Sequence, residues 1–238
     1  RARLSFPVTT SVRFKTIEKE KMKAYKFKGP DQFAYALDII FNNRLFCADW
    51  SDLNDPMEGV FAYSHRGSSK KNVKKIVGEV INEKQKLKVC SLSETFDCHL
   101  LWAHYASGFK GLAIEVELPQ MSKAIKRIKY GPLFNNLNCE EEFAPSSAAK
   151  KILTYKYQEW AYEKEIRILQ RGKFFPLKQP VSHVIAGHRM EPALFKALNY
   201  ICTIKGIRLS RTGIGDEGID ADYVAPPQDI SNILTKHI

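Results

Sequence analysis

The chain has 238 residues, of which 44% are hydrophobic and 26% are charged. This composition is typical of a globular protein, and the length suits one large domain. No stretch approaches the roughly eighteen consecutive apolar residues that a membrane-spanning helix needs, so no membrane partner is expected. The five cysteines form no Cys-x-x-Cys pair, which argues against a disulfide framework or a structural zinc site and favours the cytoplasm.

The first residues differ in character from the remainder. Residues 1–21 are basic, precede the first methionine, Met22, and lack the apolar segment of a signal peptide. We expect residues 1–21 to be a leader or an added upstream segment. Residues 22–238 are expected to form a single domain.

Local patterns predict a mixture of strands and helices. The first half is expected to contain strand 23–28, helix 31–41, strand 44–48, a turn-rich loop at 49–59, helix 70–85, strand 88–93, helix 100–105 and strand 111–118. The second half is expected to contain a loop from 131, helix 146–158, strands 163–169 and 181–185, helix 191–204, and strands 206–209 and 222–224. Because the two kinds of element do not alternate regularly, the predicted class is α+β, with a mixed, mostly antiparallel sheet flanked by helices.

The segment 160–169 (Trp-Ala-Tyr-Glu-Lys-Glu-Ile-Arg-Ile-Leu) is the strongest indication of an active site. In a strand, residues two apart project from the same face, so Glu163, Glu165 and Arg167 would point together. Two carboxylates leading into a buried strand are costly unless they are paired, exposed at a cleft or used in chemistry. The pair is therefore either catalytic or held by Arg167 or a neighbouring lysine.

Two further segments have both a structural and a functional interpretation. Residues 54–58 (Asn-Asp-Pro-Met-Glu) predict a rigid turn, but Asn54, Asp55 and Glu58 also suit a ligand-binding loop. Residues 102–105 (Trp-Ala-His-Tyr) are expected on a helical turn. His104 there is either a core residue or a group that stacks a ring or exchanges protons.

Basic side chains contribute to a formal net charge of +11 and concentrate in one expected helix. Lys70, Lys71, Lys74 and Lys75 would form a face suited to a nucleic acid, with a merely solvated helix face as the alternative. Aromatic residues are not interleaved with these lysines along the chain. A dedicated groove for single strands is therefore not predicted.

Several motifs occur in the order seen in a bacterial family catalogued as a domain of unknown function. They are 54–58 (Asn-Asp-Pro-Met-Glu), 91–94 (Ser-Leu-Ser-Glu), 102–106 (Trp-Ala-His-Tyr-Ala) and 162–167 (Tyr-Glu-Lys-Glu-Ile-Arg). The chain resembles this family over residues 24–225, which is nearly the whole expected domain. The resemblance implies a standalone cytoplasmic protein but no particular activity.

A more distant similarity is to ADP-ribosyltransferases. In that superfamily an early strand holds a Tyr-His or Arg pair, and a late strand presents a catalytic Glu, often within Glu-x-Glu. Tyr25-Lys26 and Glu163-Lys164-Glu165 fall in the corresponding order. Lys26 replaces the expected His or Arg, and no Ser-Thr-Ser element is clear, although Ser91 would take that part if the strand order permits.

The similarity to ADP-ribosyltransferases implies a toxin-like effector that uses NAD, with a nucleic acid as one acceptor. Glu165 would stabilise an oxocarbenium-like transition state, and Glu163 would activate the acceptor. The residues expected near the dinucleotide are Tyr25, Lys26, Ser91 and Tyr105.

Two other functions are alternatives. One is a nucleic-acid-binding module without catalysis, which would use the lysine face at 70–75. The other is a metal-dependent nuclease, in which the acids of 49–58 would cluster with Glu94 or His99 around Mg²⁺. The sequence contains no phosphate-binding glycine loop and no nucleophile elbow.

Overall fold

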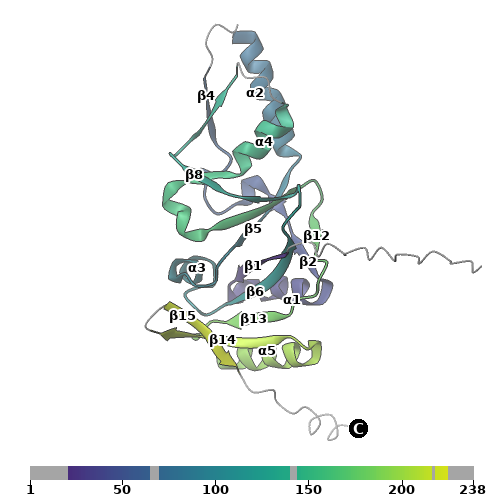
Figure 1. Ribbon diagram of the computed structural model, residues 1–238, viewed down its shortest axis with the longest axis vertical. Coiled ribbons are helices and arrows are strands. Elements are labelled where there is room, and N and C mark those ends of the chain that lie inside the picture. The colour runs from purple at the N-terminus through teal and green to yellow at the C-terminus, as the bar shows by residue number, and fades with distance from the viewer. Residues whose placement is uncertain (1–20, 65–69, 140–143, 216–217, 225–238) are drawn as a thin grey trace, which may run out of the picture.

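The computed structural model describes residues 21–64, 70–139, 144–215 and 218–224 (Figure 1). Its main sheet has nine strands, and eight of them follow the order β15-β14-β13-β6-β1-β5-β11-β7, while β3 pairs with β5. The strands are β1 (Lys21–Lys28), β3 (Ala48–Asp49), β5 (Lys88–Ser93), β6 (Leu112–Pro119), β7 (Ile125–Arg127), β11 (Glu165–Gln170), β13 (His183–Ala186), β14 (Arg208–Gly215) and β15 (Gly218–Val224). Within this sheet only β13 and β14 pair in parallel, so the predicted α+β class with a mostly antiparallel sheet is confirmed.

Three two-stranded sheets flank the main one. They are β2 (Arg44–Phe46) with β12 (Phe174–Pro176), β4 (Phe61–Ser64) with β9 (Asn135–Asn138), and β8 (Lys129–Gly131) with β10 (Tyr155–Tyr157). Most of these strands were not predicted, because runs of three or four residues are too short to show an alternating pattern.

The helices lie on both faces of the main sheet and in a separate lobe (Figure 1). They are α1 (Phe33–Asn42), α2 (Lys70–Gln85), α3 (His99–Tyr105), α4 (Pro145–Leu153) and α5 (Pro192–Lys205), with three short 3₁₀ helices η1 (Pro30–Gln32), η2 (Trp50–Asp52) and η3 (Gln158–Glu163). No helix in the described part of the chain combines the length and the apolar character that crossing a membrane requires.

Side-chain alternation along β1 divides the core in two. Ala24 packs in one cluster with residues of α1 and α5, whereas Tyr25 and Phe27 pack in another with Leu101 and Trp102 of α3. The lobe formed by α2, α4, β4 and β9 has its own apolar cluster. The helices therefore sandwich the sheet at β1, and one lobe extends beyond it.

Three expected boundaries are corrected. Lys21, assigned to the leader, is the first residue of β1 and its ammonium lies 2.9 Å from Glu117. Asp31 lies inside η1, and α1 begins two residues later. The helix expected at 146–158 ends at Leu153, because Tyr155–Tyr157 pairs with β8 as a strand.

The main sheet is nearly split between β1 and β5. β1 pairs with β6 along its full length, and β5 pairs with all six residues of β11. Between β1 and β5, however, the only paired residues are Tyr25 and Ser93. The two strands part beyond this point, and the space between them becomes the main cavity of the described residues.

Candidate functional site

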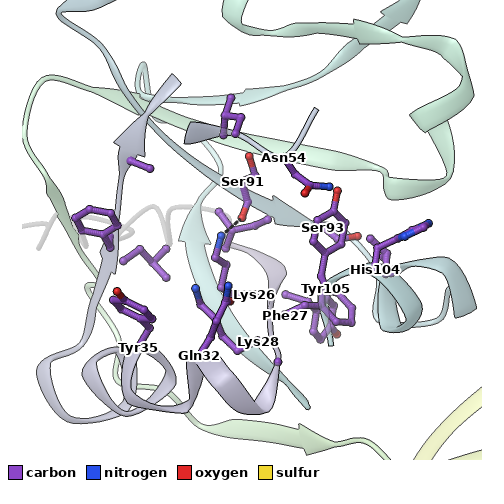
Figure 2. A pocket seen from close by; sticks show the side chains of 18 of the residues that line it. Lys26, Phe27, Lys28, Gln32, Tyr35, Asn54, Ser91, Ser93, His104 and Tyr105 are labelled. Atoms are coloured by element: carbon purple, nitrogen blue, oxygen red, sulfur yellow. Dashed lines mark hydrogen bonds between the residues drawn. The ribbon is translucent and has the colours of Figure 1, made fainter. Parts of the chain in front are cut away.

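A cleft of about 860 Å³ opens where β1 and β5 part (Figure 2). This volume lies within the roughly 300–1,000 Å³ that is usual for small-molecule sites. Tyr35 lies on one side of the cleft, and His104 and Tyr105 lie on the opposite side (Figure 2). The ionisable and polar lining includes Lys26, Lys28, Gln32, Asn54, Glu58, Ser91, Ser93, Lys156, Glu163 and Glu165.

Lys26 bridges the parted strands. Its ammonium donates a hydrogen bond of 2.8 Å to the backbone oxygen of Ser91, and the Ser91 side chain helps to lower the pKa of Glu165. The sequence placed Lys26 and Ser91 near a dinucleotide, and the structure brings both into the cleft. Lys26 retains further N–H groups that a ligand can use, since an ammonium has three donors.

Lys28 is the second cation of this wall. Burial, together with the neighbouring charge of Lys26, lowers the pKa of Lys28 to about 8. Its ammonium lies 5.3 Å from the centre of the Tyr35 ring. An anionic group bound here would stabilise the charged form of Lys28, which burial disfavours.

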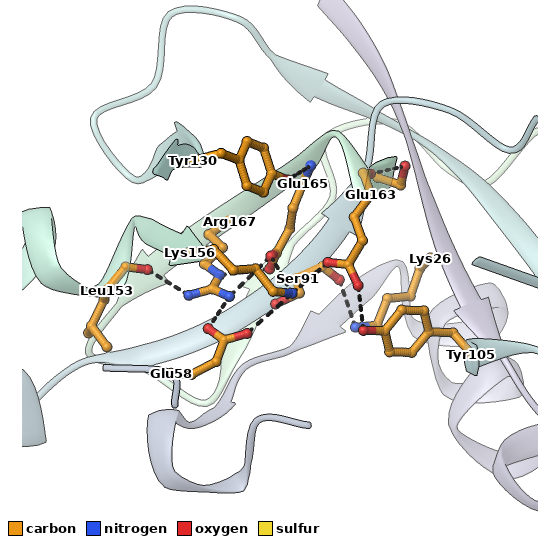
Figure 3. Close-up of polar contacts among 11 residues, drawn as sticks. Lys26, Glu58, Ser91, Tyr105, Tyr130, Leu153, Lys156, Glu163, Glu165 and Arg167 are labelled. Carbon is orange, nitrogen blue, oxygen red and sulfur yellow. Dashed lines mark hydrogen bonds and ion pairs between the residues drawn. The ribbon is translucent and has the colours of Figure 1, made fainter. Parts of the chain in front are cut away.

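Five charged side chains form a buried ion cluster at one end of the cleft, and all of them except Arg167 line the cleft (Figure 3). Lys156 Nζ lies 2.6 Å from Glu163 Oε2, 3.2 Å from Glu165 Oε2 and 3.3 Å from Glu58 Oε1. Arg167 grips Glu165 with two N–H groups, at 2.7 and 3.1 Å, and also contacts Glu58. No side chain of this ion cluster is more than 5% exposed.

The ion cluster has three carboxylates but only two cations. Burial raises the pKa of Glu58, and the nearby Glu165 adds to this rise while Arg167 and Lys156 oppose it. At Glu165 burial also acts upward, but Arg167 and Lys156 outweigh it and lower the pKa to about 2. The inner end therefore carries one excess negative charge unless Glu58 takes up a proton, and it favours a cationic ligand group.

Glu163 and Glu165 reach the cluster from different elements. Glu163 is the last residue of η3 and Glu165 the first of β11, while Lys164 between them adopts a left-handed conformation with φ of 43°. The expectation that both acids project from one face of a strand is therefore wrong. Lys164 turns the chain so that the two carboxylates approach the same Lys156 ammonium from two directions.

Glu163 is the carboxylate that faces α3. The Tyr105 hydroxyl donates a hydrogen bond of 2.6 Å to Glu163 Oε1, and the Ser93 hydroxyl donates one of 2.6 Å to the Glu163 backbone oxygen. Burial and the charge of Glu163 raise the pKa of Tyr105 above its ordinary range, so Tyr105 remains a donor. Tyr105 was expected near a dinucleotide; it lines the cleft, and its role in binding stays a prediction.

Tyr25 is used elsewhere. Its hydroxyl donates to Glu115 at 3.1 Å, and its ring packs edge-on against Phe96 with centroids 5.4 Å apart. Glu115 also contacts His183, on the neighbouring strand β13. Tyr25 borders the cleft, but its hydroxyl is bonded to Glu115 and not to a group in the cleft. The expected role of Tyr25 in ligand binding is therefore not supported.

The loop at 54–58 combines both of its predicted interpretations. Asp55 accepts a hydrogen bond of 2.9 Å from the Met57 N–H, as the turn interpretation requires. Asn54 lines the cleft, and Glu58 belongs to the ion cluster. The rigid turn thus positions one residue on each side of Asp55 toward the cleft.

Of the other predicted surfaces, the lysine face is described only in part, and the acids expected to bind a metal do not form the site that was predicted for them. Lys74 and Lys75 are exposed on α2, whereas the side chains of Lys70 and Lys71 lie outside the described residues. The acids proposed for a metal nuclease are dispersed, since Glu94 pairs with Arg127 at 2.6 Å and His99 packs against Phe109. Within the described part of the chain, no three His, Cys, Asp or Glu side chains converge as a metal site needs.

Two residues at the site were not found from the sequence. Lys156 lay inside an expected helix, although the Tyr-Lys-Tyr alternation at 155–157 was a signal for a strand. Lys28 lies two residues after Lys26, and in a strand this spacing puts both side chains on the same face. The spacing was the signal in the sequence that indicates Lys28. Both carry charge that the site depends on.

Comparison with known proteins adds no further identification. No family model, no curated protein and no solved structure matches this chain. The resemblances to a family of unknown function and to ADP-ribosyltransferases therefore stay predictions.

Proposed function

We propose that the cleft binds NAD and that the protein transfers ADP-ribose from it. The observation that carries this proposal is the order of charge along the cleft. Lys26 and Lys28 stand on the β1 wall, and the ion cluster with its excess carboxylate stands at the inner end. Oxidised NAD has a matching order, because a negative pyrophosphate joins a neutral adenosine to a positively charged nicotinamide.

The cleft offers a place for each part of this ligand. The pyrophosphate would lie at Lys26 and Lys28, and the Tyr35 ring beside Lys28 would stack the adenine. The nicotinamide and its ribose would then lie near Tyr105 and Glu163. This orientation puts the reacting carbon next to the carboxylates, as transfer requires.

Glu163 is the better candidate for the chemical step. Both oxygens of Glu165 are held by the Arg167 guanidinium, with Lys156 on one of them. Glu163 is held by a neutral phenol and by Lys156. Because its charge is less completely neutralised, Glu163 can respond more strongly to positive charge that develops on the ribose.

The step itself is a substitution at the ribose carbon. The bond from C1′ to the nicotinamide nitrogen breaks, and its electron pair leaves with nicotinamide as a neutral base. A nucleophilic atom of the acceptor forms the new bond to C1′ while Glu163 stabilises the oxocarbenium-like transition state. The proton of the acceptor passes to Glu163 and then to solvent.

Other earlier expectations also stay predictions. The lysine face at 70–75 of α2 remains a nucleic-acid contact to be tested, and Lys74 and Lys75 are exposed there. The toxin-like role and the cytoplasmic location follow from the resemblance and the cysteine pattern.

The test is calorimetric titration with NAD combined with chromatographic detection of released nicotinamide. The wild-type protein should bind NAD and release nicotinamide, and Glu163→Gln should bind NAD but release far less. Glu159→Gln is the matched control, because Glu159 lies in the same η3 but is exposed. Absence of binding at millimolar NAD would refute the proposal.

A further inference from the structure

Three aromatic rings gather where α3 meets η3. The His104 ring lies 6.2 Å from the Trp160 ring and 6.4 Å from the Tyr162 ring, and those two are 6.0 Å apart. His104 is exposed, and Trp160 and Tyr162 are partly exposed. We call these three residues the aromatic platform. The ring planes are tilted by 34–62° to one another, and Lys156 Nζ lies over the Trp160 ring, 4.8 Å from its centre.

The aromatic platform adjoins the candidate reacting carboxylate. Tyr162 directly precedes Glu163, and burial followed by the charge of Glu163 raises the pKa of Tyr162 to about 12. His104 lines the cleft and directly precedes Tyr105, whose hydroxyl holds Glu163. A flat group stacked on the platform would lie at the mouth of the cleft, on the side of Glu163.

Two exposed lysines lie on segments next to η3: Lys164 directly follows it, and Lys129 belongs to β8, which contacts it. The Ile128 N–H donates to the Glu165 backbone oxygen at 3.0 Å, which places Lys129 and Lys164 on either side of this contact. Both lysines are exposed, and neither forms an ion pair with any residue the structure describes. η3, which β8 contacts, is the element that carries Trp160 and Tyr162 of the aromatic platform.

We propose that the aromatic platform, with Lys129 and Lys164, binds a single-stranded nucleic acid. A base would stack on the rings, and the two lysines would contact the adjacent phosphates. Every base has a flat face that can stack on an aromatic ring. Sites for single strands combine such rings with positively charged side chains that contact the phosphates. The base on the platform is then the acceptor of ADP-ribose, a step that rests on the proposed function.

A surface for single-stranded nucleic acid was not expected from the sequence. Aromatic and basic residues are not interleaved along the chain, and on that ground no single-strand groove was predicted. Folding brings His104 of α3 next to Trp160 of η3, and it brings β8, which contains Lys129, into contact with η3. The pattern exists only in the folded chain, at the side of the cleft.

The binding test uses fluorescence anisotropy of labelled oligonucleotides of about twelve nucleotides, single- or double-stranded, without NAD. Trp160→Ala should weaken single-strand binding about tenfold or more, since a stacked base contributes that much, and Trp160→Phe should retain most of the affinity. Lys129→Ala with Lys164→Ala should reduce the slope of log affinity against log salt by roughly one unit. Duplex should bind more weakly than single strands.

Three control variants separate this surface from others. Tyr200→Ala and Lys196→Ala change exposed residues of α5, at the far end of the molecule from α2, and should leave binding unchanged (Figure 1). Lys74→Ala with Lys75→Ala tests the α2 face. Loss of binding in that double variant, with unchanged binding by Trp160→Ala, would overturn the proposal in favour of α2.

The outcomes distinguish this proposal from the proposed function. If Trp160→Ala loses the oligonucleotide but binds NAD normally, the platform is a nucleic-acid site whose loss is not misfolding. If single strands bind at the platform but NAD does not bind, the surface stands and the transferase function fails. If NAD is turned over but oligonucleotides do not bind, or if only proteins become labelled with ADP-ribose, the platform proposal is refuted.

Discussion

Glu163 and Glu165 lie two residues apart and share the Lys156 ammonium, yet their other partners differ. Glu165 begins β11, and its carboxylate is held by the Arg167 guanidinium and by Lys156. Glu163 ends η3 and faces Tyr105 and the aromatic residues of α3. The two carboxylates of this short motif can therefore have different roles. Glu165 compensates buried cations, whereas Glu163 is the one proposed to act on a ligand.

The division follows from the cost of burying charge. A buried carboxylate needs nearly complete compensation, and a guanidinium gripping both oxygens supplies it. A carboxylate that must stabilise a developing cation cannot be so fully compensated, because its field would be cancelled.

Glu165→Gln should mainly destabilise the fold. It removes one of the two carboxylates that compensate Arg167, which is fully buried, and breaking such a pair typically costs about 3–5 kcal/mol. Denaturant unfolding measures the change. Glu117→Gln, which loses only the exposed pair with Lys21, should cost less than about 1 kcal/mol and serves as the control.

The same variant should change how stability depends on acid. Because the pKa of Glu165 is lowered to about 2 from an ordinary 4.5, its ionised form stabilises the folded state above pH 4.5. This contribution is lost as the pH falls toward 2. The stability difference between wild type and Glu165→Gln should therefore narrow across that window, and a constant difference would contradict the assigned ion pairs.

Glu163→Gln should mainly affect turnover. We expect nicotinamide release to fall about a hundred- to a thousandfold, the usual loss when one electrostatic contact to a transition state is removed. The midpoint of unfolding should change much less than in Glu165→Gln, since Lys156 keeps two other carboxylates. If Glu165→Gln folds fully and it alone abolishes turnover, the two roles are reversed.

The sequence predicted the frame of this site better than its contacts. β5 and α2 fall where expected, since a buried apolar run and a long periodic pattern are strong local signals. Lys26, Ser91 and Tyr105 were placed correctly near one another. The chain direction at Lys164 was missed, because a left-handed non-glycine residue has no local signature there.

The contacts within the ion cluster could not be read from local patterns. Glu58, Lys156 and Arg167 come from a loop and two separate strands, and only tertiary structure decides which charges meet. Tyr25 illustrates the opposite error. A tyrosine in a strand has two faces available, and its partner Glu115 lies on the next strand of the sheet, 90 residues away in sequence.

The excess carboxylate of the ion cluster should make the cleft distinguish oxidised from reduced NAD. Oxidised NAD carries a positive nicotinamide, so it should bind about tenfold more tightly than NADH, a difference of about 1.4 kcal/mol. That is a modest part of the roughly 4 kcal/mol between unit charges at 4 Å near a protein surface. Titration of both ligands measures the ratio of their affinities. Glu58→Gln leaves two carboxylates and two cations in the cluster, so it should bring this ratio close to one.

The smallest expected change in NAD affinity comes from Lys28, on the β1 wall of the cleft. The pKa of Lys28 is lowered to about 8, so Lys28 loses its charge as the pH rises through that value, and NAD affinity should fall a few-fold between pH 7 and about 9.5. Lys26, Cys90 and Asp31 are the ionisable groups that also act on the pKa of Lys28. Lys28→Arg should abolish the pH dependence, because a guanidinium stays charged throughout this range. Lys28→Met should bind weakly at every pH, and a retained pH dependence in either variant would show that another group, not Lys28, meets the phosphates.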